Sequence, residues 1–240
     1  MRGLFVTGTD TGVGKTILCA ALLAAVAAEG RRVRAHKPVV TGLEDRAEIA
    51  ARGEWPPDHE LLAAAADMRP EEVAPLRYGP AVSPHLAAQL AGERIDPQRL
   101  ISAARGGAGG DDTAGRDVSV VEGVGGLLTP LAEGLTVCDL AVALKLPVLI
   151  AARPGLGTIN HTLLTLEAAR AADLDVCAVV LTPWPAEPTA IERSNRETIG
   201  ALGDVEVECL GVLAGPDRDR LARAGATLPW QRWLGRVSAA

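Results

Sequence analysis

The chain has 240 residues, which is enough to bury one large hydrophobic core without help from disulfides or metal ions. Hydrophobic residues make up 48% and charged residues 22%, and this balance excludes a disordered or fibrous protein. The net charge of −6 argues against nucleic acid or an anionic membrane as a partner, because both attract basic proteins. A bound phosphate would therefore have to be held by local groups.

No segment of the sequence predicts export or membrane insertion. The longest apolar run, residues 17–28, falls well short of the roughly 20 residues that a membrane span needs. The first residues form a predicted strand and lack the pattern of an export signal. The four cysteines are widely spaced and form no CxxC pair, so we expect neither a disulfide nor a cysteine metal site. The expected location is the cytoplasm.

Apolar runs alternate with helical patterns along the chain. Six of these runs predict strands, at residues 3–7, 33–39, 118–121, 147–151, 176–181 and 207–213. Such alternation is typical of an α/β fold with a mostly parallel, twisted sheet and helices on both faces. The helix predicted at residues 15–29 is apolar on nearly all sides and ends at Gly30, so it should pack deep against the sheet.

Two further segments carry local signals. Ser83 followed by Pro84 predicts the N-cap and first position of another helix. Residues 103–117 are rich in glycine and aspartate and contain no hydrophobic anchor, which predicts a mobile surface loop. No repeat or linker divides the sequence, so we expect a single domain spanning residues 1–240.

The segment after the first predicted strand, TGTDTGVGKT at residues 7–16, is similar to a P-loop. Its glycines allow backbone N–H groups to face one phosphate, Lys15 can reach the β- and γ-phosphates, and the Thr16 hydroxyl can bind Mg²⁺. The usual P-loop consensus, GxxxxGK[ST], would place a glycine at position 9, whereas here Gly8 stands one residue earlier. A plain glycine turn would explain the glycines but not the Lys15–Thr16 pair.

Lysine is rare in this chain, since only Lys15, Lys37 and Lys145 occur among 24 basic residues. Lys37 lies near the carboxyl end of the second predicted strand, the edge at which open α/β sheets bind ligands. A surface lysine is the alternative interpretation. Its neighbour His36 should point to the opposite face of the sheet, and we assign it no role.

Two acidic residues are candidates for a magnesium site. Glu122 ends the third predicted strand, before glycines that let a ligand approach the backbone, and this is the position of a Walker-B acid. Asp58 precedes an apolar run, so the residues alone favour a helix cap over a metal ligand. Together these motifs predict a nucleoside triphosphatase or a phosphotransferase.

Six segments, taken in order, resemble the dethiobiotin synthetase family: VTGTDTGVGKT at residues 6–16, KPVVTG at 37–42, PPDHELL at 56–62, SPHLAAQLAGERI at 83–95, VEGVGGLLTPL at 121–131 and GLGTINHTLLT at 155–165. The resemblance covers residues 1 to about 165 and implies a P-loop NTPase-like fold. It also implies the ATP-dependent carboxylation and cyclisation of 7,8-diaminopelargonic acid with CO2 or bicarbonate to dethiobiotin. The reaction would pass through a carbamate and a carbamic–phosphoric anhydride and release ADP and phosphate.

The resemblance also implies roles for individual residues. Lys37 and Lys15 would be catalytic, and Mg²⁺ would be held by Thr16, Asp58 and Glu122. The triphosphate would lie in a cradle formed by Gly12, Val13, Gly14, Lys15, Thr16 and Ile17, and the nucleotide would also be bound by Asp58, Glu122, Gly123, Val124 and Gly125. The diamine would contact Thr11, Lys37, Thr41 and Ser83. In a homodimer, the partner subunit would complete the substrate site with Gly155, Leu156, Gly157 and Asn160.

The sequence departs from the family pattern at the residues expected to bind the nucleotide base. Many members have an asparagine that reads adenine, whereas this chain has Thr182 and Pro183, which cannot present a paired donor and acceptor. Further base contacts are expected from Ala214, Gly215 and Pro216. Because a rotatable hydroxyl discriminates weakly, we expect CTP, GTP and UTP to work within about tenfold of ATP in kcat/KM. Val124 replaces the usual alanine beside the phosphates.

Two alternatives stay open at this point. One is a nucleotide-switched partition or targeting ATPase, whose loop carries a second lysine five residues before the P-loop lysine. Here that position is Asp10, and no basic or amphipathic membrane tail is present. The other alternative is a different amide-forming ligase of the same superfamily.

Overall fold

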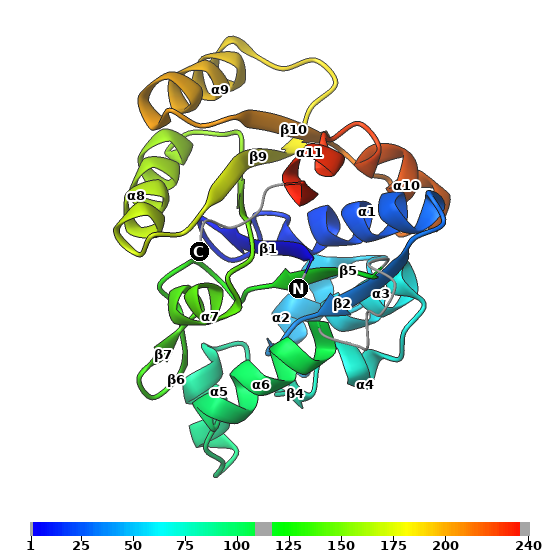
Figure 1. Cartoon of the computed structure of the whole chain (residues 1–240), viewed down its shortest axis with the longest axis vertical. Coiled ribbons are helices and arrows are strands. Elements are labelled where there is room, and N and C mark those ends of the chain that lie inside the picture. The colour runs from blue at the N-terminus through cyan, green and yellow to red at the C-terminus, as the bar shows by residue number, and fades with distance from the viewer. Residues whose placement is uncertain (1, 109–116, 236–240) are drawn as a thin grey trace.

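A computed structural model describes residues 2–108 and 117–235. Its centre is a six-stranded sheet in the order β10-β9-β8-β1-β5-β2, and every pairing in it is parallel (Figure 1). The strands are β1 (Gly3–Gly8), β2 (Arg32–His36), β5 (Asp117–Glu122), β8 (Val148–Ala152), β9 (Val176–Trp184) and β10 (Val207–Gly211). The predicted parallel α/β sheet is confirmed, and all six predicted apolar runs contribute a strand to it.

Helices cover both faces of the sheet, as the absence of polar alternation in the strands predicts (Figure 1). Successive residues of β1 point to opposite faces, so Leu4 and Val6 join one hydrophobic core and Phe5 joins the other. The first core is completed by α1 (Lys15–Ala28), α3 (Asp58–Ala66), α10 (Arg218–Gly225) and α11 (Trp230–Leu234). The second is completed by α6 (Pro97–Ala108), α7 (Val137–Leu144), α8 (Thr158–Ala171) and α9 (Ala190–Gly203).

Helix α1 is buried along most of its length between the sheet, α3 and α10, as its apolar sequence predicts. The chain leaves the helix through Gly30, whose φ of 75° lies in the left-handed region that favours glycine. Because α1 starts directly after the glycine-rich segment, its deep burial fixes the position of that segment at the carboxyl edge of the sheet.

The connection between β2 and β5 is long and contains α2 (Arg46–Arg52), α3, α4 (Pro70–Val73), α5 (Pro84–Leu90) and α6. It also contains a two-stranded parallel sheet of β3 (Val39–Val40) and β4 (Leu76–Arg77). A second small pair, β6 (Pro130–Ala132) and β7 (Leu135–Thr136), is antiparallel and follows β5. These short elements stand over the carboxyl edge of the main sheet.

The predicted strand at residues 33–39 is wrong in its second half. Strand β2 ends at His36, the Lys37 N–H bonds to the Val73 carbonyl, and Val39 pairs with Leu76 in the small sheet. The physical reason is Pro38, which has no N–H for a ladder with β5. The break leaves Lys37 outside the ladder of the main sheet, at the carboxyl end of β2.

The predicted loop at residues 103–117 is also wrong at its start, because α6 continues to Ala108. Asp96 caps this helix by accepting from the N–H groups of Gln98 and Arg99, and Leu100 and Ala104, four residues apart, are buried in the core. Residues 109–116 of the predicted loop lie outside the described residues.

The four cysteines all lie in the described part of the chain, and none of them forms a disulfide. Within residues 2–108 and 117–235, no helix is both long enough and apolar enough to cross a membrane.

Candidate active site

A cavity of about 830 Å³ opens at the carboxyl edge of β1, β2 and β5. The residues that line it come from the P-loop, from the β2–α5 connection and from the loop after β5. Among them are many of the predicted site residues: Thr11, Gly12, Gly14, Lys15, Thr16, Ile17, Lys37, Thr41, Asp58, Ser83, Glu122, Val124 and Gly125. Segments far apart in the sequence therefore meet around one hollow.

The P-loop has the backbone that anion binding requires. Gly12 and Gly14 have φ values of 69° and 90°, and Gly14 is the N-cap of α1 without any side-chain cap. The first-turn N–H groups of α1 thus lack the side-chain acceptor that usually covers a helix start, and they can serve a phosphate. The Lys15 ammonium folds back over the loop and donates to the Asp10 carbonyl at 2.8 Å.

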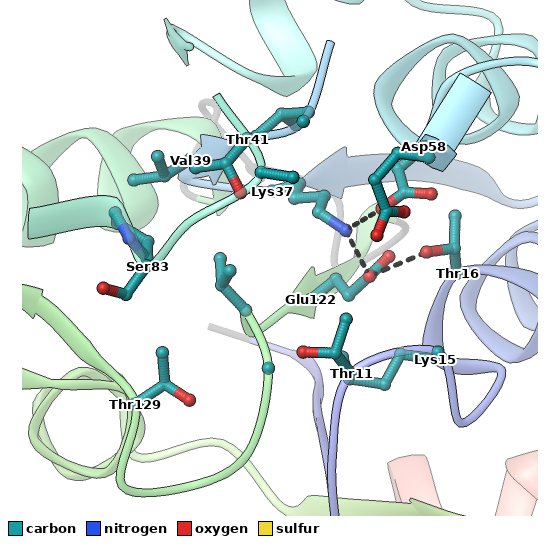
Figure 2. Close-up of a pocket in the computed structure, with 18 of the residues that line it drawn as sticks. Thr11, Lys15, Thr16, Lys37, Val39, Thr41, Asp58, Ser83, Glu122 and Thr129 are labelled. Carbon is teal, nitrogen blue, oxygen red and sulfur yellow. Dashed lines mark hydrogen bonds and ion pairs between the residues drawn. The ribbon is translucent and has the colours of Figure 1, made fainter. Parts of the chain in front are cut away.

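Lys37 is the centre of the charged cluster. Its ammonium donates to Asp58 and, at 2.6 Å, to Glu122 Oε1, while the Thr16 hydroxyl donates to the same Glu122 oxygen at 2.8 Å (Figure 2). Lys37 is only 5% exposed and Glu122 is fully buried. One compact cation therefore joins two carboxylates that come from α3 and from the end of β5.

Asp58 does not cap a helix, so the interpretation that its local sequence favours is wrong. The N-cap position of α3 belongs to Pro57, and Asp58 is the first residue of the helix. Its carboxylate points at Lys37 instead, as Figure 2 shows. The ion pair with a lysine 21 residues earlier has replaced the local backbone bond.

The pKa values in this cluster reflect burial and mutual attraction. Burial alone would lower the pKa of Lys37, but Asp58 and Glu122 raise it well above its usual value. Burial raises the pKa of Glu122 despite Lys37, whereas Lys37 overcomes burial at Asp58 and lowers the pKa of that carboxyl group. Burial lowers the pKa of Lys15 to about 8, with Glu122 opposing the shift. Lys37 is thus held as a cation.

The same residues fit a magnesium ion. Glu122 Oε2 is buried and has no hydrogen-bond partner among the described residues, which leaves one carboxylate oxygen able to accept a ligand. No cluster of three or more His, Cys, Asp or Glu side chains suited to a metal occurs in the described part of the chain. Mg²⁺ needs no such cluster, because it is usually bound through one or two carboxylates, water and substrate phosphates.

The other end of the cavity is less charged. Thr41, Val39 and Ser83 lie across it from Lys15 and Thr16, as Figure 2 shows. Ser83 occupies the N-cap position of α5, as predicted, but its hydroxyl contacts His85 Nδ1 at 3.0 Å and does not cap the helix. This wall combines apolar surface with hydroxyl groups.

Sequence reasoning missed some of the lining. Thr129 lines the cavity, and its hydroxyl accepts the Gly126 N–H at 3.0 Å, which fixes the glycine loop after Glu122. Trp55 and Glu48 line the cavity from the β2–α3 connection. The position of Thr129 between the glycine loop and Pro130 could have indicated its role. The local sequence around Trp55 and Glu48 gives no such indication.

Several predicted residues lie outside this cavity. Val13 and Gly123 are buried beside it. Thr182 is 2% exposed, and its side chain packs against Gly14, where an added Cβ would meet Thr182 Cγ2 at 2.7 Å. The remaining base-contact candidates, Pro183 and Ala214–Pro216, lie where β9 and β10 reach the same edge of the sheet.

The predicted partner loop is separate from the cavity as well. Gly155, Leu156 and Gly157 lie between β8 and α8, and Asn160 lies in the first turn of α8. All four are exposed, and Leu156 is 98% exposed. The segment nevertheless begins beside the P-loop, because Arg153 donates to the Thr11 carbonyl at 2.9 Å.

The chain is similar in sequence to known proteins. A family model described as an AAA domain matches residues 2–215. A curated relative from Anaeromyxobacter sp. (strain Fw109-5), named ATP-dependent dethiobiotin synthetase BioD, is 42% identical over an alignment of 216 residues that covers 85% of this chain and 91% of the relative. A relative with the same name from Mycolicibacterium gilvum is 36% identical and covers 98% of this chain and 99% of its own length.

Solved structures resemble the chain in fold alone. The MinC:MinD cell division protein complex of Aquifex aeolicus matches with a TM-score of 0.52 at 14% identity, covering 98% of this chain and 92% of that one. The signal recognition particle receptor FtsY of Elizabethkingia anophelis also gives 0.52 at 14% identity, covering 93% of this chain and 65% of that one. These neighbours confirm the expected P-loop NTPase-like α/β class.

Proposed function

The chain belongs to the ATP-dependent dethiobiotin synthetase family and is a ligase, and we propose that it closes a cyclic urea on 7,8-diaminopelargonic acid with CO2 and ATP. The observation that carries this proposal is the position of Lys37. Its buried ammonium lies in the same cavity as the P-loop and the hydroxyl-lined wall of Thr41 and Ser83. The transfer of a phosphoryl group to a carbamate brings two anions together. A cation between the P-loop and the substrate end of the cavity would stabilise both.

The proposed reaction has three steps. A substrate amine bonds to CO2 and loses a proton, which gives a carbamate. A carbamate oxygen attacks the γ-phosphorus of ATP, and ADP leaves with the bridging oxygen. The second amine then attacks the carbamate carbon, loses a proton and expels phosphate, which carries away the oxygen that had joined carbon to phosphorus.

The second step sets the electrostatic problem, because an anionic carbamate approaches an anionic triphosphate. Lys15 and Lys37 flank the cavity, and both are buried, so their charges act in a poorly solvated space. Lys37 is held in its charged form by Asp58 and Glu122, which accept two of its three N–H donors, and the third donor can serve the transferring phosphoryl group. The proposed role of Lys37 is to stabilise charge on the transferring group.

Magnesium is part of the proposal, and Thr16, Asp58 and Glu122 would hold it. When bound, the ion supplies positive charge that offsets the negative charge of the phosphate oxygens. The Thr16 hydroxyl and the Glu122 carboxylate already share a hydrogen bond, so these two side chains are oriented before any ligand arrives.

We further propose a homodimer in which one subunit's segment 155–160 completes the substrate site of the other. Support comes from the exposure of Leu156 and from a second hollow of about 470 Å³ along α8, lined by the exposed Leu128 and Leu164. Exposed apolar side chains that gather on one surface are typical of an interface. The distal carboxylate of the substrate would meet the backbone N–H groups of this segment.

The direct test is to supply purified protein with 7,8-diaminopelargonate, bicarbonate, Mg²⁺ and ATP and to identify the product by mass spectrometry. We expect dethiobiotin, with one ADP and one phosphate for each product molecule. Omitting either the diamine or bicarbonate should reduce phosphate release to background. Phosphate release that is independent of the diamine would instead support a nucleotide-switched ATPase, and turnover of a different amine or acid would support another amide-forming ligase.

A further inference from the structure

Asn195 of α9 makes a contact that the reaction scheme does not use. The residue is 7% exposed, and its side-chain nitrogen donates to two consecutive carbonyls, Pro154 at 2.9 Å and Gly155 at 3.1 Å. Helices α8 and α9 pack side by side, so Asn195 reaches across to the segment that leads into α8 (Figure 1). A buried amide whose two hydrogens serve neighbouring peptide groups fixes the orientation of both.

The segment that Asn195 holds would otherwise have considerable freedom. Gly155 and Gly157 flank the exposed Leu156, and neither glycine has any neighbouring atom within 4 Å of the place where a Cβ would stand. Gly157 has a φ of 87° and caps α8 without a side-chain hydrogen bond. Because glycines lose much conformational entropy when they are ordered, a side chain that anchors their carbonyls lowers the cost of ligand binding.

The Gly155 carbonyl connects this anchor to the start of α8. It accepts the Thr158 N–H at 3.3 Å in addition to the Asn195 amide. Asn195 therefore acts on the turn that places the first N–H groups of α8, and these are the groups that the proposed function assigns to the substrate carboxylate. Loss of the Asn195 amide would loosen those groups without touching the P-loop or Lys37.

We propose that Asn195 is a positioning residue that orders segment 154–158 for the carboxylate of the substrate. The inference rests on the proposed function, since it concerns the same substrate. It assigns Asn195 no contact with the reacting atoms. Its effect should therefore appear in the KM for the diamino acid and leave both kcat and the KM for ATP almost unchanged.

The test compares Asn195→Asp and Asn195→Ala with wild type and with Ser194→Ala, which changes the exposed neighbour on the same helix. Asn195→Asp keeps the shape of the side chain, but its carboxylate oxygen cannot donate to the carbonyls of Pro154 and Gly155. We expect the KM for 7,8-diaminopelargonate to rise about tenfold to a hundredfold in both Asn195 variants. Ser194→Ala should match wild type.

A second substrate separates positioning from general damage. With 2,3-diaminononane, which keeps the vicinal diamine and lacks the carboxylate, the Asn195 variants and wild type should give the same kcat/KM. An equal loss on both diamines, or a raised KM for ATP, would overturn the proposal and make Asn195 a general structural residue. An unchanged KM for the diamino acid would overturn it as well.

A measurement that does not depend on enzymatic activity tests the role of Asn195 separately from the proposed function. In Asn195→Ala, amide hydrogen exchange should speed up about tenfold or more at residues 156–160 and stay unchanged in the buried strand β9. If wild type converts neither diamine, the proposed function fails, and this exchange measurement still decides whether Asn195 orders the loop. Unchanged exchange at residues 156–160 would overturn the inference whatever the activity.

Discussion

Lys37 carries the charge on which the proposed phosphoryl transfer depends. Its ammonium is buried between Asp58 and Glu122, in a space that fits a compact cation. Lys37→Arg should lower kcat about 100-fold or more and leave nucleotide binding within a few-fold of wild type, because a planar guanidinium cannot take the same place. Stopped-flow phosphate release and nucleotide titration measure the two effects.

Two other lysine variants serve as comparisons for this prediction. Lys145→Arg makes the same exchange on the exposed surface at the end of α7 and should keep wild-type kcat. Lys15→Ala should weaken nucleotide binding together with turnover, since this lysine belongs to the cradle for the ground-state phosphates. Near-normal turnover in Lys37→Arg would remove Lys37 from the proposed role.

His36 stands next to Lys37 and faces the opposite side of the sheet, in the apolar core. Neither ring nitrogen has a hydrogen-bond partner among the described residues, and burial lowers the pKa to about 4 from 6.5. Below pH 6.5 the unfolded chain therefore binds a proton that the folded chain rejects. The free energy of unfolding should fall by about 2 kcal/mol between pH 7 and pH 5 from this group alone.

Urea unfolding of His36→Leu across this pH range checks the prediction. The variant should lose that part of the pH dependence, and at pH 8 it should be at least as stable as wild type because no unpaired ring nitrogen stays buried. A pH dependence that persists in full in His36→Leu would assign it to another group.

The sequence predicts those site residues whose position follows from a strand end or from a motif. Lys15, Lys37 and Glu122 belong to this class, because the carboxyl ends of parallel strands share one edge. Asp58 and Asn195 do not, since each contacts a partner 21 to 41 residues away and its local sequence carries no trace of that contact. Sequence resemblance supplied the role of Asp58, and only the structure revealed Asn195.

At the scale of elements, α1 and α10 approach unusually closely. A Cβ added to Gly225 of α10 would lie 2.1 Å from the backbone oxygen of Ala21 in α1. Gly225→Ala should therefore destabilise the protein by about 2–4 kcal/mol, because one of the two helices has to shift away from the other. Chemical denaturation measures the change.

Gly200→Ala in α9 is the matched control, since its nearest neighbour would be Val207 Cγ2 at an ordinary 3.6 Å. This variant should be neutral or up to about 1 kcal/mol more stable, as expected for alanine inside a helix. Equal effects at positions 200 and 225 would contradict the close contact of α1 with α10.

The elements that sequence patterns predict well are the long ones. The six main strands and α1 combine apolar runs with clear stops, whereas the pairs β3–β4 and β6–β7 are two or three residues long and have no periodic signal. The end of α6 is predicted as a loop because its glycines favour a loop. The burial of Leu100 and Ala104 keeps the segment helical. Tertiary packing overrode local propensity there.

At the scale of the whole molecule, the cavity depends on the long β2–β5 connection, which brings Thr41, Asp58 and Ser83 over the P-loop. No local pattern predicts this arrangement, because it results from several short elements packing together. The proposed dimer adds a second long-range dependence, since Lys37 and segment 155–160 would act in the same site from different subunits.

Mixing two inactive variants tests this division. Lys37→Ala removes the cation, and Asn160→Asp places a carboxylate in the first turn of α8 without replacing a glycine of the loop. Each variant alone should be inactive, and refolding or subunit exchange of an equal mixture should restore about a quarter of wild-type activity, because each heterodimer holds one intact site. A mixture that stays inactive would place the loop in its own subunit's site.

In the proposed reaction a carbamate oxygen attacks the γ-phosphorus of ATP, so an oxygen atom of bicarbonate should be transferred to the phosphate that is released. The reaction is started with ¹⁸O-labelled bicarbonate in unlabelled water, and the phosphate is analysed by mass spectrometry before the label exchanges with solvent. We expect one ¹⁸O atom in each phosphate released, appearing together with dethiobiotin. Phosphate that contains only unlabelled oxygen would show that water attacks ATP, and it would contradict the proposed mechanism.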